Sequence, residues 1–433
     1  MGPFHYDYSQ TMMMKMGIGL PDNKGGCILY NSFSDALEKI KKIDALTLGA
    51  PKIIYLVGWQ YQGHDDKYPA FFEVNEAAKR PEDATALESL IWLVEEAKKY
   101  HTVVSYHINL SDAYPDSPLW EEYLKNDLIL KNSFGKPKAT GTWNGRTAYQ
   151  VRFAKEYQTG FFQKRIDRLL ALLPVQQAAT VHVDAFFVRK GRGTSIVEEK
   201  EYRRKMIDYF GRKGIDVTSE FIYRERRSGL RLHFGKSDVI GLIPAFWNLV
   251  MTQNDYLRYS PQVVAGGKLN LDLQRDKDLQ YLFYGNTAGE DCFHNCENWE
   301  TMFLKEFALG SVPYFFLNQF TPEQVTGKGK KRIAAFSGGV RTAIQGRKIM
   351  RNGICLKEEE TLCLPLAWRP GSWFAWSAQA GTKEIHVPFS EAVISEITPE
   401  GTKFLARQKT QGGKLRLNFA GGAAYEITQG VQV

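Results

Sequence analysis

Two carboxylates follow two short apolar runs in the middle of the chain. Asp184 lies in Val-His-Val-Asp-Ala-Phe-Phe (181–187), and Glu220 lies near the end of Ile-Asp-Val-Thr-Ser-Glu-Phe (215–221). Both runs are β-prone, and the helix-like stretch 200–212 between them predicts a βαβ step with parallel strands. Each carboxylate then sits at the carboxyl end of its strand, where (β/α)8 barrels carry their active sites. Two such carboxylates suit glycoside hydrolysis, with one as acid and the other as nucleophile or base.

The surroundings of the two carboxylates favour different protonation states. Two apolar residues follow Glu220, and an apolar setting raises the pKa of a carboxyl group, which suits a general acid. Asp184 would remain ionised near the anomeric carbon, as a nucleophile or base must. The alternative is structural, because nearby arginines such as Arg189, Arg192 and Arg224 could hold both carboxylates in salt bridges.

Polar and aromatic side chains also follow other predicted strands. They lie in Gly-Trp-Gln-Tyr-Gln-Gly-His-Asp (58–65), His-Ile-Asn-Leu-Ser-Asp-Ala-Tyr-Pro-Asp (107–116) and Pro-Ala-Phe-Trp-Asn (244–248). This mixture suits a sugar, because polar groups bind its hydroxyls and indole faces cover the apolar side of its ring. The residues expected to contact a sugar are Trp59, Gln60, His64, Asp65, His107, Asn109, His182 and Trp247.

Strands and helices alternate over the first three quarters of the chain. Strands are predicted at 27–30, 52–58, 102–108, 237–243 and 312–317, and helices at 34–43, 84–99 and within 149–173, beside the two carboxylate strands and their helix. This alternation predicts a parallel sheet. After about residue 330, short β-type runs separated by Gly-rich turns predict an antiparallel domain. We therefore expect an α/β protein with a (β/α)8 TIM barrel at 1–330, followed by a β-sandwich-like domain at 331–433.

Charge and cysteine usage exclude several classes of protein. The formal charge is +8, but the basic residues are scattered and interleaved with glutamates, and no nucleic-acid-binding motif accompanies them. The five cysteines predict no disulfide framework. Cys292, His294 and Cys296 lack a second ligand pair at zinc spacing, so no metal or other cofactor is expected. We expect no nucleic-acid partner, and these patterns do not predict the oligomeric state.

The amino terminus predicts a location. It lacks a basic region followed by an apolar core, and Met12–Met14 is too short for a signal or a membrane span. The sequence therefore predicts a cytoplasmic protein without a membrane partner, or a secreted one if a signal peptide has been removed.

The motifs resemble, in order and approximate spacing, the core of the endo-α-N-acetylgalactosaminidases, which are glycoside hydrolase family 101. The resemblance covers roughly residues 50–320, and its most specific parts are Gly-His-Asp (63–65) and His-x-Asn-x-x-x-Ala-Tyr-Pro (107–115). Pro-Tyr-Phe-Phe-Leu-Asn-Gln (313–319) resembles the last barrel strand of the family, and Trp143 resembles its stacking tryptophan near the entrance.

The resemblance implies a retaining mechanism without a catalytic metal, acting on mucin-type O-glycans. Asp184 matches the nucleophile that forms a covalent glycosyl-enzyme, and Glu220 matches the acid/base. His64, Asp65 and His107 match sugar-binding positions.

Two other functions remain open at this stage. Secreted members of the family are very large, so a compact intracellular relative is expected, similar to the α-N-acetylgalactosaminidases of family 129. Such a relative could be an exo-acting α-galactosidase or α-N-acetylgalactosaminidase. A catalytically silent glycan-binding protein on the same scaffold would keep Trp59, His64 and Trp143 without needing either carboxylate in a particular ionisation state.

Overall fold

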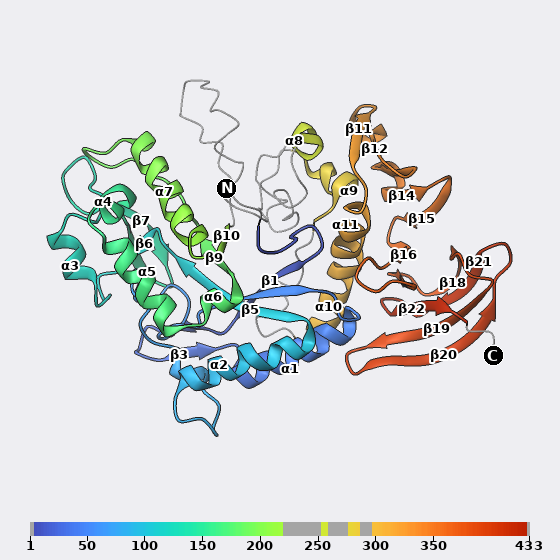
Figure 1. The fold of residues 1–433 in the computed structure, drawn as a ribbon, viewed down its shortest axis with the longest axis horizontal. Helices are drawn as coiled ribbons and strands as arrows, with labels where there is room; N and C mark the ends of the chain where they lie inside the picture. The colour runs from blue at the N-terminus through green and yellow to red at the C-terminus, as the bar shows by residue number, and fades with distance from the viewer. Residues whose placement is uncertain (1–3, 220–252, 259–275, 286–296, 431–433) are drawn as a thin grey trace.

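The computed structural model describes residues 4–219, 253–258, 276–285 and 297–430, and Figure 1 shows their arrangement. A parallel sheet with helices packed around it forms the first part of the molecule, and an antiparallel β-domain forms the other end.

Five parallel strands form the sheet that carries the predicted site. Its order is β1-β4-β5-β9-β10, and every neighbouring pair is parallel. The strands are β1 (Met12–Gly17), β4 (Lys52–Val57), β5 (Thr102–Asn109), β9 (Thr180–Asp184) and β10 (Asp216–Ser219). Four of them were predicted within a few residues, and β1 was missed. Parallel strands in sequence order that alternate with helices are the arrangement of a (β/α)8 barrel.

The outer helices begin at well-defined caps. In α1 (Phe33–Leu46) and α2 (Ala86–Ala97), Ser32 and Thr85 cap the first turn, and each forms a reciprocal capping box. The long helix predicted within 149–173 is two helices, α4 (Phe153–Gln158) and α5 (Phe161–Leu172). They separate at Gly160, whose φ of 80° ends the first helix.

The prediction of a strand at 312–317 is wrong. This segment is the helix α11 (Val312–Leu317), which continues from α10 (Trp299–Glu306) through a π-helical turn at Phe307–Ser311. All six residues of α11 are buried, so the segment has no polar face that would reveal a helical period. The predicted strand at 237–243 lies outside the described residues.

A small insertion extends from the end of β5. It contains α3 (Trp120–Lys125) and the three-stranded antiparallel sheet β6-β8-β7, whose strands span Asp112–Ala113, Arg146–Gln150 and Ala139–Trp143. Trp143 lies at the tip of the β7–β8 hairpin. The predicted strand at 27–30 is β3 (Cys27–Leu29), which pairs with β2 (Gly19–Pro21) and not with the parallel sheet.

The carboxyl-terminal part is antiparallel, as predicted. Ten strands form one sheet, namely β11 (Pro322–Thr326), β12 (Ile333–Phe336), β13 (Val340–Ala343), β14 (Lys348–Arg351), β15 (Ile354–Glu358), β16 (Thr361–Pro365), β17 (Ser372–Ser377), β22 (Ala424–Gln429), β19 (Glu391–Thr398) and β20 (Gly401–Lys409). β18 (Gly381–His386) and β21 (Lys414–Phe419) form a separate pair. The sheet starts at Pro322, and the domain boundary at residue 331 stays a prediction.

The two parts share an apolar core. β19 and β20 pack against α1, and Nε1 of Trp368 donates to the carbonyl oxygen of Thr47 at 3.1 Å. Within the described residues, no helix combines the length and apolar character needed to cross a bilayer.

Stability should depend on pH through Glu199, a buried residue of α7 (Ile196–Gly211), the helix that joins β9 to β10. Burial raises the pKa of Glu199 from 4.5 to about 7. Because the folded-state pKa is the higher one, the stabilising contribution of the neutral form is complete below about pH 4.5 and is lost as the pH rises through 7. We expect Glu199→Gln to raise the stability at pH 8 by about 1–3 kcal/mol, and by much less at pH 5.

Thermal unfolding of the variant and the wild type at the two pH values checks this expectation. Glu198→Gln, a change at a less buried position of the same helix, is the matched control. An equal shift in melting temperature at both pH values would contradict the role of Glu199.

Candidate active site

Two adjacent strands position the predicted nucleophile and its neighbours. Asp184 is the last residue of β9, and His107 and Asn109 lie near the end of β5. In the parallel register, His107 is opposite His182 and Asn109 is opposite Asp184. Alternate residues of a strand face the same side of a sheet, so these side chains gather at the carboxyl end of the sheet.

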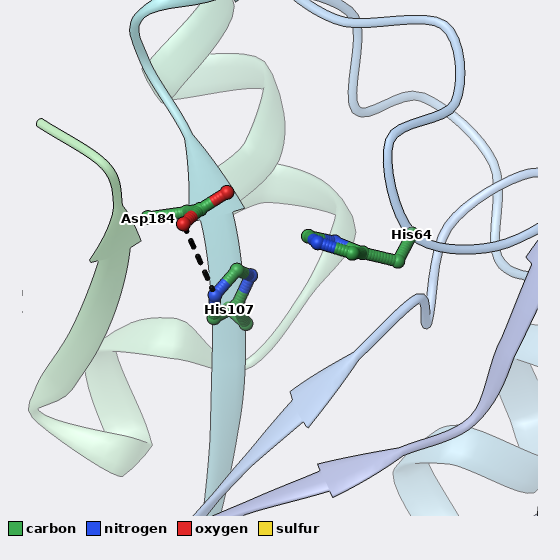
Figure 2. Close-up of side chains that lie close together, drawn as sticks. All are labelled: His64, His107 and Asp184. Atoms are coloured by element: carbon green, nitrogen blue, oxygen red, sulfur yellow. Dashed lines mark ion pairs between the residues drawn. The ribbon is translucent and has the colours of Figure 1, made fainter. Parts of the chain in front are cut away.

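Asp184, His64 and His107 form a cluster, which we call the carboxylate–histidine cluster (Figure 2). Nε2 of His107 lies 3.9 Å from Oδ1 of Asp184, and the rings of His64 and His107 meet edge to face with centroids 5.1 Å apart. His107 is buried, whereas the Asp184 side chain is 14% exposed and that of His64 is 24% exposed. Asp184 is thus open to a ligand.

Asn109 holds the carboxylate of Asp184 in place. Its Nδ2 donates to Oδ2 of Asp184 at 3.2 Å and to Oδ2 of Asp112 at 3.0 Å. Its Oδ1 accepts the backbone N–H groups of Ser111 and Asp112 at 2.7 and 2.8 Å. These four hydrogen bonds fix the amide orientation, so Asn109, which was predicted to contact a sugar, acts here as a support for Asp184.

Asp112 is a site residue that the sequence reasoning missed. It is buried, accepts a hydrogen bond from the Thr140 hydroxyl at 2.9 Å, and has a pKa raised mainly by burial. Its position within the 107–116 motif was the available signal. Because Thr140 belongs to β7, the strand that leads to Trp143, Asp112 connects the entrance hairpin to the support of Asp184.

The loop after β4 brings His64 and Asp65 to the cluster. It packs against the backbone of Gly19, whose oxygen accepts the N–H of His64 at 2.8 Å. A Cβ at Gly63, where φ is 133°, would lie 2.4 Å from that oxygen, so only glycine fits. Oδ2 of Asp65 lies 3.5 Å from Nε2 of His64. His64 therefore lies beside Asp184, and Asp65 lies beside His64, whereas their contact with a sugar stays a prediction.

Trp143 lies at the entrance of the site. Its side chain is 46% exposed, and the neighbouring Asn144 donates from Nδ2 to the carbonyl oxygen of His64 at 3.3 Å. This contact ties the hairpin tip to the His64 loop. The indole is exposed, and its stacking on a sugar ring stays a prediction.

Two predicted sugar contacts, Trp59 and Gln60, lie too deep to reach a ligand. Trp59 is fully buried against Phe71 and Tyr106, and its Nε1 donates to the carbonyl oxygen of His107 at 3.0 Å. Gln60 is also buried, and its Nε2 donates to Gly63 at 2.9 Å. Both side chains therefore support the site by hydrogen bonds to its backbone.

His182 supports His107 from beneath. The two rings stack with centroids 5.1 Å apart, and Nδ1 of His182 lies 2.8 Å from the hydroxyl of Thr218. His182 is buried behind His107, a position from which it can orient that ring. The predicted Glu220 and Trp247 lie outside the described residues; the last described residue of β10, Ser219, pairs with Val183 next to Asp184.

The carboxylate–histidine cluster could also attract a metal ion, although none was expected from the sequence. One potential ligand atom from each side chain lies within 4.8 Å of the others. A zinc ion holds its N and O ligands at about 2.1 Å, hence about 3.4 Å from one another, so these side chains would have to move closer.

We expect added Zn²⁺ to inhibit turnover, because it would occupy Asp184, the carboxylate that the sequence predicts as the nucleophile. His64→Gln should weaken this inhibition about tenfold or more, since it removes one of three ligands. Inhibition constants for Zn²⁺ in the two proteins measure the effect, with His101→Gln, an exposed histidine that pairs with Asp44, as control. A loss of turnover on treatment with EDTA would instead reveal a required metal.

Known proteins resemble this chain in sequence and in fold. Residues 21–242, just over half of the chain, match the family model described as endo-α-N-acetylgalactosaminidase. The structure is similar to the ligand-free α-N-acetylgalactosaminidase NagBb from Bifidobacterium bifidum, with a TM-score of 0.55 and 11% identity over 79% of this chain and 58% of that one. Its complex with GalNAc gives a TM-score of 0.53 and 12% identity, over 79% and 57% of the two chains.

These values define what the similarity establishes. The chain spans less than two thirds of the length of the solved structures it matches. At this identity the similarity concerns the fold, which is a (β/α)8 barrel followed by an antiparallel β-domain, as predicted from the sequence.

Proposed function

Because the chain belongs to the endo-α-N-acetylgalactosaminidase family of glycoside hydrolases, we propose that it cleaves α-linked glycans that contain N-acetylgalactosamine or galactose, with retention of configuration. The observation that carries this proposal is the partly exposed Asp184 carboxylate, held by Asn109 beside His64 and His107 at the carboxyl end of the sheet. A fixed, accessible carboxylate at this position suits a nucleophile.

In the proposed first step, the Asp184 carboxylate attacks the anomeric carbon as the bond to the leaving oxygen breaks. Asn109 donates to Oδ2, which fixes the orientation of the carboxylate, and Oδ1 is the proposed attacking oxygen. Glu220 is the proposed acid that protonates the leaving oxygen, and the product of this step is a glycosyl-aspartate ester.

In the proposed second step, Glu220 takes a proton from water, and the resulting nucleophile attacks the same anomeric carbon. The bond to Asp184 breaks and returns its carboxylate, so two inversions give overall retention. His64, Asp65 and His107 are proposed to bind sugar hydroxyls, and Trp143 is proposed to stack on a ring at the entrance.

A second candidate function uses the same residues without turnover. Most of the polar side chains around Asp184 that suit sugar binding would serve a catalytically silent glycan-binding protein equally well. Membership of a glycoside hydrolase family favours the enzyme over this alternative.

Release of p-nitrophenol from three α-glycosides tests the proposal. The substrates carry N-acetylgalactosamine, galactose, or the disaccharide Galβ1-3GalNAc, and we expect turnover of at least one. Release from the disaccharide alone means an endo mode, and release from a monosaccharide means an exo mode. Binding of these sugars without any release would favour the silent binding protein.

A further inference from the structure

The loop that follows β4, residues 58–67, carries Asp65 and has an unfavourable backbone. Three of its residues other than glycine, Tyr61, Asp65 and Lys67, have φ values of 44°, 60° and 59°. These values lie in the left-handed region, which a residue with a Cβ rarely adopts. Such a backbone persists only where contacts from outside the loop hold it in this shape.

Arg146 makes such contacts from the β7–β8 hairpin. It is the first residue of β8 and is the cross-strand neighbour of Trp143. Its Nη1 donates to Oδ1 of Asp66 at 2.7 Å and to Oδ2 of Asp116 at 3.0 Å, and its Nη2 donates to the carbonyl oxygen of Asp65. The guanidinium therefore joins the hairpin to the loop through charge-assisted hydrogen bonds.

The burial of Asp66 makes this connection a strong constraint. The Asp66 side chain has no exposed surface, and its Oδ2 accepts the backbone N–H of Gln62 at 3.0 Å. A buried carboxylate needs an opposite charge beside it, and Arg146 supplies that charge. The guanidinium carbon also lies 5.0 Å from the centre of the Tyr114 ring. A planar, forked donor suits this arrangement, which an ammonium group cannot copy.

His64 and Asp65 are held by different contacts. The N–H group of His64 donates to the oxygen of Gly19, and its carbonyl oxygen accepts from Asn144. Arg146, in contrast, holds the carbonyl oxygen of Asp65. Loss of the Arg146 contact would therefore leave the contacts of His64 in place and release the backbone of Asp65. A small rotation of that backbone would displace the Asp65 carboxylate.

We propose that Arg146 is a positioning residue for sugar recognition, which acts through the backbone of Asp65 and does not touch the sugar. The role of Asp65 as a sugar ligand rests on the proposed function, whereas the contacts of Arg146 do not. Because Arg146 neighbours Trp143 on the hairpin, its guanidinium also fixes the distance between the indole that is proposed to stack and the carboxylate that is proposed to bind a hydroxyl.

Arg146→Lys tests this role in the full-length protein. Lysine keeps the charge beside Asp66 but lacks the fork that reaches Asp66 and the Asp65 carbonyl together. We expect KM for a p-nitrophenyl glycoside to rise about tenfold while kcat changes less than about twofold, because a displaced Asp65 weakens substrate and transition state alike. In an Asp65→Ala background, the same substitution should change KM by less than about twofold, since its route to the sugar is gone.

Arg152→Lys is the matched control. Arg152 lies two residues after β8, and its Nη1 donates to Oδ2 of Asp127 at 2.8 Å. Its side chain is 23% exposed, compared with 21% for Arg146. This variant should keep the wild-type KM, because its ion pair does not reach the loop at 58–67.

Hydrogen exchange of the peptides that cover 58–67 separates this inference from the proposed function. Exchange there should be faster in Arg146→Lys than in Arg152→Lys, whether or not the protein hydrolyses a glycoside. Equal exchange in the two variants, an unchanged KM, or the same rise in KM with and without Asp65 overturns the proposal. If the protein binds N-acetylgalactosamine without turnover, the Kd from calorimetry replaces KM: a rise in Arg146→Lys that disappears in Asp65→Ala supports the positioning role and removes only the hydrolytic function, and an unchanged Kd overturns that role.

Discussion

Asp184→Asn should reduce kcat by about 10³–10⁵-fold on a p-nitrophenyl glycoside, with a small change in KM. The substitution keeps the size of the side chain but removes the charge and most of the nucleophilicity of the attacking oxygen. Asn109 still donates to the amide oxygen, so the neighbouring contacts survive. Steady-state kinetics of the variant measure the loss, and binding of the sugar should persist.

A smaller variant at the same position adds a chemical test. Asp184→Gly should regain turnover with added azide, because the anion fits the space left by the carboxylate and attacks the anomeric carbon directly. The product would be a glycosyl azide of inverted configuration. Asp167→Asn is the matched control, since Asp167 is an exposed residue of α5 that bonds Tyr209. Full turnover by Asp184→Asn would contradict the proposed mechanism.

Asn109→Asp should reduce kcat by about 10²-fold at neutral pH, although Asn109 itself performs no chemistry. The change places a third carboxylate between Asp112 and Asp184, where the amide now donates to both. Like charges at this distance disfavour the ionised form of Asp184. In addition, the side chain at position 109 loses the N–H group that donated to Asp184 and presents an acceptor oxygen instead. The acid limb of the pH–rate profile should therefore move to higher pH, which loss of a purely structural contact would not cause.

The control for this variant is Asn126→Asp. Asn126 ends α3, and its Nδ2 donates to the carbonyl oxygen of Glu122 on the exposed side of the insertion. It should keep the wild-type pH profile. If Asn109→Asp also kept that pH profile and only lowered the melting temperature, Asn109 would stabilise the fold without positioning Asp184.

The sequence predicted the positions of the strands and which polar residues cluster, but it did not predict how deeply each side chain is buried. β4, β5, β9 and β10 are apolar runs bounded by polar residues, so their positions follow from pattern alone. His182 and Asp184 face the same side, but His182 is two residues, or about 6.6 Å, further from the end of the strand. This depth along the strand decides that Asp184 meets solvent and His182 does not.

The errors have similar physical causes. Trp59 follows β4 directly, and only the path of the loop shows that its indole turns into the core. The segment Val312–Leu317 is buried on all sides, so its apolar run gives no period by which to tell a helix from a strand. β1 was missed because its Met-rich run has weak β-propensity, and its identity depends on pairing with β4 far along the chain.

Trapping the glycosyl-enzyme tests the central claim most directly. An activated 5-fluoro-α-N-acetylgalactosaminyl fluoride should react with the wild-type protein and accumulate, because the fluorine slows the hydrolysis of the intermediate more than its formation. Mass spectrometry of the digested protein should then show one adduct, on the peptide that contains Asp184, and no adduct in Asp184→Asn. An adduct on a different carboxylate, or turnover that releases inverted sugar without any adduct, would contradict the assignment of Asp184 as the nucleophile.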